Sequence, residues 1–124
     1  MRLTILIATA IALCASAARA QPLWTWTLYE DPASLALANE VPDTEQLAAV
    51  LECKPGSGAA KVSVFPKGDG VAPVAQEFRT MDPAFAEFVK TGKLSFKTDG
   101  GAGDIEMKAE HRPKLERFAR LCGA

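Results

Sequence analysis

Two cysteines, Cys53 and Cys122, are the residues whose type and spacing point most directly to chemistry. They stand far apart in the chain, whereas a redox-active pair stands close together, as in a Cys-x-x-Cys motif with a lowered thiol pKa. The third cysteine, Cys14, belongs to an apolar N-terminal stretch that we expect to be removed. An even number of remaining cysteines in a compartment that permits disulfides favours a structural bond. We therefore predict a Cys53–Cys122 disulfide, which leaves no thiol for catalysis or metal binding.

The single histidine, His111, is the next candidate for chemistry. Its ordinary pKa near neutrality would suit a general base, but a surface position just before a helix is equally consistent with the sequence. A catalytic triad also needs an activated nucleophile, and Ser63 lies in an alternating strand pattern with no elbow motif. A zinc site needs several histidine or thiolate ligands. We therefore expect no enzymatic activity, no metal site and no cofactor.

Binding residues are easier to find than catalytic ones. Trp24 and Trp26 share one face of an expected strand and could form a flat platform for a sugar or a peptide, although such a pair is also typical of a core. The last helix carries basic residues that could dock on an acidic partner or an anionic membrane surface, or could simply face solvent. The predicted binding surface consists of Trp24, Trp26, Arg112, Lys114 and Arg117.

A glycine-rich loop spans Asp99 to Asp104. A phosphate-binding loop would continue into Lys-Ser/Thr and a helix, and a calcium loop would space its oxygen ligands regularly and add a distant glutamate. Neither pattern is present, so the segment is expected to be the tip of a hairpin.

The first twenty residues have the three parts of a secretory signal. Arg2 supplies the positive start, Leu3 to Ala15 is apolar, and small residues end the segment at Ala20. The apolar run is too short for a membrane span. We predict cleavage after Ala20, leaving residues 21–124 as a single exported domain, periplasmic or extracellular, with no stable membrane insertion.

Loss of the leader changes the charge of the protein. Twelve basic and fifteen acidic residues remain, a net charge of −3, which argues against general nucleic-acid binding. The charged residues from Gln21 to Glu52 are all acidic, while the rest of the chain has a net charge of +3. We expect the two segments to neutralise each other across neighbouring strands. The alternative is an acidic patch that recruits a basic partner.

Alternation with period two dominates the mature chain and predicts strands. Pro55 and Gly56 suit the two central positions of a type II turn between two of them. Helix formers at 44–49 leave that segment open between helix and strand, and they favour a helical turn that passes into a strand at Val50. The expected strands cover 24–29, 35–41, 46–53, 60–65, 71–79, 94–97 and 105–108.

Two segments switch to the helical period. The first has Asp82 as N-cap, Pro83 in the first turn and Gly92 past the end, with Met81, Phe85 and Phe88 among its apolar residues. The second begins near Pro113 and carries Cys122 on its apolar stripe. The fold class is therefore α+β: an antiparallel β-sheet of six to seven strands, sandwich- or barrel-like, covered by two short amphipathic helices.

The run from Leu51 to Gly56, followed by Val62-x-Val64-Phe65, resembles the Cys-x-x-Gly hairpin of small periplasmic β-barrel lysozyme inhibitors. The Ser-Gly inhibitory loop of that family is not evident here, and two helices are not expected in it. The resemblance implies a binding role.

Together these observations predict a small exported, non-enzymatic binding or accessory protein. Its partner would be a protein or another envelope component, and the protein itself is expected to be a monomer. An inhibitor of an envelope-directed hydrolase such as lysozyme is the alternative, with the Asp99–Asp104 tip as its contact loop. An enzyme is the third possibility.

Overall fold

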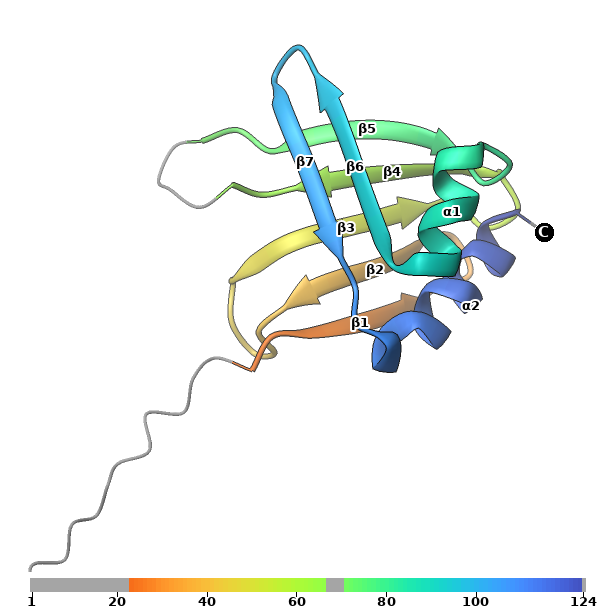
Figure 1. The fold of residues 1–124 in the computed structure, drawn as a ribbon. Coiled ribbons are helices and arrows are strands. Elements are labelled where there is room, and N and C mark those ends of the chain that lie inside the picture. The colour runs from red at the N-terminus through yellow and green to blue at the C-terminus, as the bar shows by residue number, and fades with distance from the viewer. Residues whose placement is uncertain (1–22, 67–70, 124) are drawn as a thin grey trace, which may run out of the picture.

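The computed structural model describes residues 23–66 and 71–123, which form seven strands, two α-helices and a short 3-10 turn (Figure 1). The predicted leader and most of the turn expected at 66–70 lie outside these residues. None of the helices in the described ranges is long and apolar enough to cross a membrane. The elements are β1 (Thr25–Glu30), β2 (Leu35–Glu40), β3 (Leu47–Cys53), β4 (Ala59–Val64), β5 (Val74–Arg79), α1 (Pro83–Thr91), β6 (Lys93–Thr98), β7 (Gly101–Glu106), η1 (Ala109–His111) and α2 (Arg112–Gly123).

The first five strands form an antiparallel sheet in which each strand pairs with the next along the chain. The turn between β3 and β4 is closed by the Ser57 N–H, which donates to the Lys54 carbonyl at 3.0 Å. Gly56 has φ +76° at the third position of this turn, as a type II turn requires. The predicted hairpin is therefore confirmed.

The helical turn expected at 44–49 is wrong, because β3 is extended from Leu47 onward. Leu47 pairs with Glu40 beyond a bulge in β3, where Ala48 has no register partner in β2, and β3 pairs on its other side with β4. Helix propensities differ by only tenths of a kcal/mol per residue, so two flanking hydrogen-bond ladders outweigh them. The chain reaches β3 through a turn in which the Val41 N–H donates to the Gln46 carbonyl.

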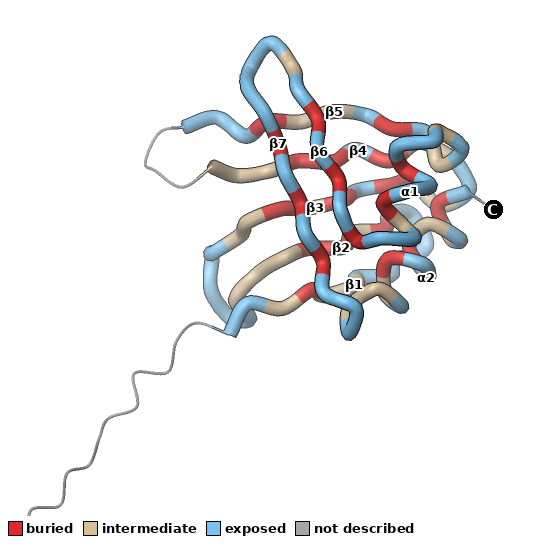
Figure 2. The backbone as a smooth tube through the Cα atoms, viewed as in Figure 1, coloured by how far each residue is buried: buried red, intermediate tan, exposed pale blue. Residues whose placement is uncertain are grey.

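The β6–β7 hairpin, α1 and α2 lie together on one face of the five-stranded sheet (Figure 1). The core lies between these layers, where buried positions of the sheet meet those of the helices and hairpin (Figure 2). Phe78 of β5 and Phe96 of β6 meet edge to face with ring centroids 5.7 Å apart. Met81 was expected on the apolar face of α1, but it precedes the helix and is 89% exposed. The α+β prediction is confirmed, with seven strands divided into sheets of five and two.

The opposite face of the large sheet carries small side chains. One row across all five strands consists of Thr27, Ala38, Val50, Ser63 and Ala75, which are neighbours in the strand register. No helix or strand of the described chain packs on this face. Larger polar residues flank the row, and Tyr29 and Glu40 lie at its β1–β2 end.

The Tyr29 hydroxyl on this face donates a hydrogen bond to Glu40 Oε1. This bond, desolvation and the negative charge of Glu40 raise the pKa of Tyr29 above its ordinary value of 10.0. Because the folded state favours the neutral phenol, the contribution of the Tyr29–Glu40 bond to the stability of the fold is fully present below the ordinary pKa of tyrosine. It is lost as the pH rises through the higher pKa of the folded state.

Since the chain has one tyrosine, tyrosinate absorbance reports this group alone. We expect Glu40→Ala to lower the titration midpoint, and an unchanged midpoint would contradict the assignment.

Candidate functional site

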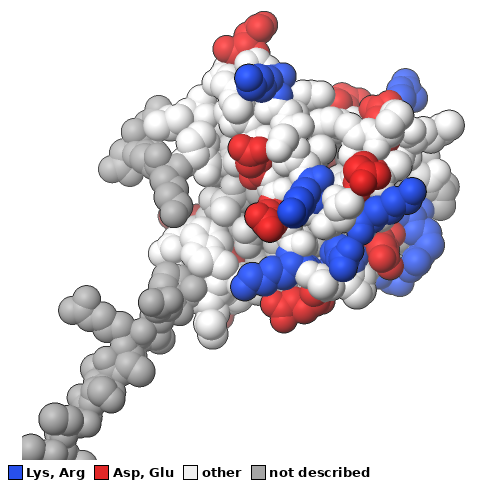
Figure 3. Space-filling model, in the orientation of Figure 1, with Lys and Arg blue, Asp and Glu red and all other residues white. Residues whose placement is uncertain are grey.

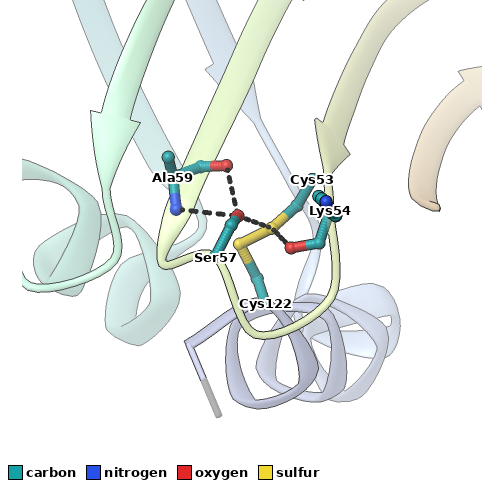
Figure 4. Close-up of a disulfide and its surroundings, with 5 residues drawn as sticks. All are labelled: Cys53, Lys54, Ser57, Ala59 and Cys122. Atoms are coloured by element: carbon teal, nitrogen blue, oxygen red, sulfur yellow. Dashed lines mark hydrogen bonds between the residues drawn. A yellow bond between two sulfur atoms is a disulfide. The ribbon is translucent and has the colours of Figure 1, made fainter. Parts of the chain in front are cut away.

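The predicted disulfide joins Cys53, at the end of β3, to Cys122 in the last turn of α2 (Figure 4). The two Cα atoms are 5.8 Å apart, and both residues are buried. The turn after β3 holds the same end of the helix, because the Gly56 and Gly58 N–H groups donate to the Leu121 and Cys122 carbonyls. This arrangement is structural. It fits a protein exported to an oxidising compartment.

The structure separates the two tryptophans that sequence analysis placed on one face. Trp26 is 4% exposed and belongs to the core, whereas Trp24 is 44% exposed. A flat platform of two accessible rings is therefore not formed. One indole is available to a ligand, and the other belongs to the core.

The three basic residues of the predicted binding surface all contact other elements from α2. Lys114 Nζ donates to the Trp26 carbonyl on β1, and Arg112 Nη1 donates to the Lys90 carbonyl at 2.6 Å. Arg117 forms an ion pair with Glu30 at 2.8 Å, which joins the acidic segment to the basic one between a helix and a strand rather than across neighbouring strands as expected. Lysine and arginine side chains gather over this part of the surface (Figure 3). Arg112, Lys114 and Arg117 therefore anchor the helix, and their docking role stays a prediction.

A small cavity, which we call the tryptophan pocket, has a volume of about 170 Å³. It lies where the start of β1 and the end of β2 meet the end of β7 and the turn η1. His111 is held in this turn by its N–H, which donates to the Lys108 carbonyl, and its Nε2 atom is 3.4 Å from Glu110 Oε1. The lining residues are Trp24, Trp26, Asn39, Glu106, Lys108, Glu110 and His111.

The lining of the tryptophan pocket combines an accessible aromatic face with polar groups of several kinds. Asn39 supplies an amide, Glu106 and Glu110 supply carboxylates, and Lys108 supplies an ammonium group. The lining includes no serine, threonine, cysteine or tyrosine that could act as a nucleophile. The sequence contains no pattern that links His111 to Trp24, and the structure places both in the lining of one pocket. The one sequence signal for this pairing is that Trp24 begins an expected strand and His111 stands just before an expected helix.

A second and larger depression, of about 420 Å³, lies on the open face of the sheet near the disulfide. A cross-strand row of Glu52, Lys61 and Glu77 borders it, and Ser57 and Lys54 add further polar groups. Its lining contains no aromatic side chain. The tryptophan pocket is the smaller of the two, but it has the mixture of stacking and hydrogen-bonding groups that fixes a ligand's orientation. We therefore take it as the candidate site.

The loop predicted to be a hairpin tip joins β6 to β7 and lies beyond β5 in Figure 1. Asp99 and Gly100 are exposed there. No residue of the Asp99–Asp104 segment lines the tryptophan pocket.

Comparisons of the chain with family models, with curated proteins and with solved structures found no match.

Proposed function

We propose that this protein is an exported, non-enzymatic binding module that holds a neutral saccharide of the cell envelope in the tryptophan pocket. The observation that carries the proposal is the half-exposed indole of Trp24 beside a polar cavity. The C–H face of a pyranose ring stacks on an indole, and its hydroxyls need donors and acceptors around the ring edge. Asn39, Glu106 and Lys108 supply both kinds of group.

The charges of the pocket select among saccharides. Two carboxylates, Glu106 and Glu110, face one lysine, and Glu110 lies beside His111. An acidic sugar would meet repulsion from the carboxylates, whereas an uncharged sugar would not. A volume of about 170 Å³ accommodates one ring rather than a chain, so further sugar units of an oligomer would extend into solvent. We therefore expect affinity to depend on one sugar unit.

Trp24→Ala should weaken saccharide binding about tenfold, because loss of the stacked ring costs about 1.5 kcal/mol. The measurement is a calorimetric titration of the oxidised protein with oligomers of N-acetylglucosamine, and with oligomers of glucose for comparison. Tyr29→Ala is the matched control, since Tyr29 is a half-exposed aromatic outside the pocket, on the strand β1 that begins directly after Trp24. Binding that is absent in the wild type, or equal in the wild type and Trp24→Ala, would refute the site.

A hydrolase is the second candidate, because the pocket brings His111 together with two carboxylates. A histidine–carboxylate pair can activate water as a general base. Product analysis of the same titration mixtures separates the two functions. A binding module leaves the oligomers intact, while a hydrolase shortens them and loses that activity in His111→Ala and Glu106→Gln.

A further inference from the structure

The larger depression, of about 420 Å³, lies where two hairpin turns meet the open face of the five-stranded sheet. The turn before β2 supplies Ala33 and Ser34 to its lining, and the turn after β3 supplies Lys54 and Ser57. We call this depression the hairpin hollow. Its volume falls within the range of about 300–1,000 Å³ that is typical of sites for small molecules.

The hairpin hollow is formed by small residues that stand among long ones. Ala36 of β2 is placed between Tyr29 and Glu52 in the strand register, and Ala59 of β4 stands opposite Arg79. Both alanines belong to the lining of the hollow. Because each has only a methyl group, a gap remains beside the longer side chains of the neighbouring strands.

Hydrogen bonds hold the walls of the hairpin hollow in place. The backbone groups of Asp31 and Ser34 exchange two bonds, at 3.0 and 3.2 Å. The turn after β3 is fastened to α2 by the disulfide and by two backbone hydrogen bonds. The Ser57 hydroxyl accepts from the Ala59 N–H at 3.3 Å (Figure 4). Walls that are ordered before a ligand arrives reduce the free energy that binding loses to ordering.

Charged side chains of both signs line the hairpin hollow. In the strand register Lys61 of β4 stands directly between Glu52 of β3 and Glu77 of β5. The charged residues of the lining are Glu52, Lys54, Lys61 and Glu77, and all four are exposed. The two ion pairs found in the described part of the chain involve none of them. Each of the four therefore keeps its hydrogen-bonding capacity for a ligand.

The alternation of these charges limits the class of ligand. Two carboxylates and two ammonium groups sum to zero, so the hairpin hollow attracts neither a lone anion nor a lone cation. An anion at Lys61 would meet a carboxylate on each neighbouring strand, about 4.8 Å away. A cation at Glu52 would meet Lys54 and Lys61. A ligand that carries a carboxylate and an ammonium group together satisfies both signs.

We propose that the hairpin hollow binds a short zwitterionic peptide, with the α-carboxylate on Lys61 and the α-ammonium group on one of the flanking carboxylates, Glu52 or Glu77. The charged ends of an extended dipeptide are about 7 Å apart, which is more than one strand spacing and less than two. A dipeptide therefore reaches from a lysine on β4 to a glutamate on a neighbouring strand. This site is separate from the proposed saccharide site, because the two cavities involve opposite ends of β2 and share no lining residue.

The first test varies the charges of the ligand. The oxidised protein is titrated calorimetrically with L-alanyl-L-alanine, with its N-acetylated form, with its C-terminal amide and with the doubly blocked form. We expect the unmodified dipeptide to bind about tenfold or more tightly than each singly blocked form, because each block removes a charge-assisted hydrogen bond. The absence of binding by the unmodified dipeptide, or an equal affinity for any blocked form, would overturn the proposal.

The second test locates the site on the protein. Lys61→Met removes an ammonium group from the hairpin hollow and should weaken binding of L-alanyl-L-alanine about tenfold. Lys97→Met, at an exposed position of β6 outside both cavities, is the matched control and should bind as the wild type does. Trp24→Ala should also bind the dipeptide normally, so a failure of the saccharide proposal leaves this one standing. Equal weakening by Lys61→Met and Lys97→Met would show a general effect of charge and would refute the site.

Discussion

Replacing Cys53 and Cys122 together with alanine should lower the free energy of unfolding by about 4 kcal/mol, the entropy of closing a loop of this length in the unfolded chain. The bond closes 69 positions of the chain and fastens α2 to the end of β3. Since small domains have total stabilities of about 5–15 kcal/mol, this is a large share. The corresponding fall in melting temperature is about 15 °C or more for a domain of this size.

Thermal unfolding measured by circular dichroism tests this expectation in two independent ways. The wild type treated with a reductant should melt close to the double alanine variant, because both lack the same bond. Adding the reductant to the variant should change nothing. Equal melting temperatures for the oxidised and reduced wild type would show that the disulfide does not stabilise the domain, whatever the variant does.

Several parts of this fold follow from short-range signals in the sequence. The type II turn at Pro55–Gly56 follows from a fixed φ at proline and a positive φ at glycine. The bounds of α1 follow from Pro83 in the first turn and Gly92 past the end, whereas Asp82 stands at the N-cap position but its carboxylate accepts from the Arg79 N–H and does not cap the helix. The disulfide follows from the number of cysteines outside the predicted leader. None of these requires knowledge of where distant segments meet.

Segment 44–50 and the tryptophan pocket could not be derived in this way. The choice of strand at Leu47 depends on hydrogen-bond ladders to β2 and β4, which local propensity does not contain. The pocket depends on the packing of η1 against the start of β1, which brings His111 beside Trp24. Alternation placed Trp24 and Trp26 on one face but could not show that only one of them is buried. The site is therefore a product of tertiary packing.

Gly92→Ala should lower the free energy of unfolding by about 3 kcal/mol. Gly92 ends α1 with φ +78°, a conformation that costs an L-residue about 1–2 kcal/mol. An added Cβ would lie only 2.3 Å from the Met107 carbonyl oxygen. The backbone there cannot yield freely, because the Gly92 carbonyl accepts from the Met107 N–H at 2.7 Å and the Gly92 N–H donates to Phe88. Weakening these bonds adds about 1 kcal/mol to the conformational cost.

Two other glycines provide matched controls that separate conformation from crowding. Gly58 has φ +71° but its nearest neighbour, Thr80 Oγ1, would be 3.8 Å from an added Cβ, so Gly58→Ala should cost about 1 kcal/mol. Gly100 lies outside the left-handed region, with Thr98 Oγ1 3.6 Å away, and Gly100→Ala should change stability by less than about 0.5 kcal/mol. Urea unfolding at constant m-value gives all three numbers. Gly92 joins the end of α1 to the start of β6 and contacts Met107, the residue after β7. An equal loss at Gly92 and Gly58 would therefore mean that the Met107 carbonyl moves aside at no cost, and that this junction is looser than its hydrogen bonds indicate.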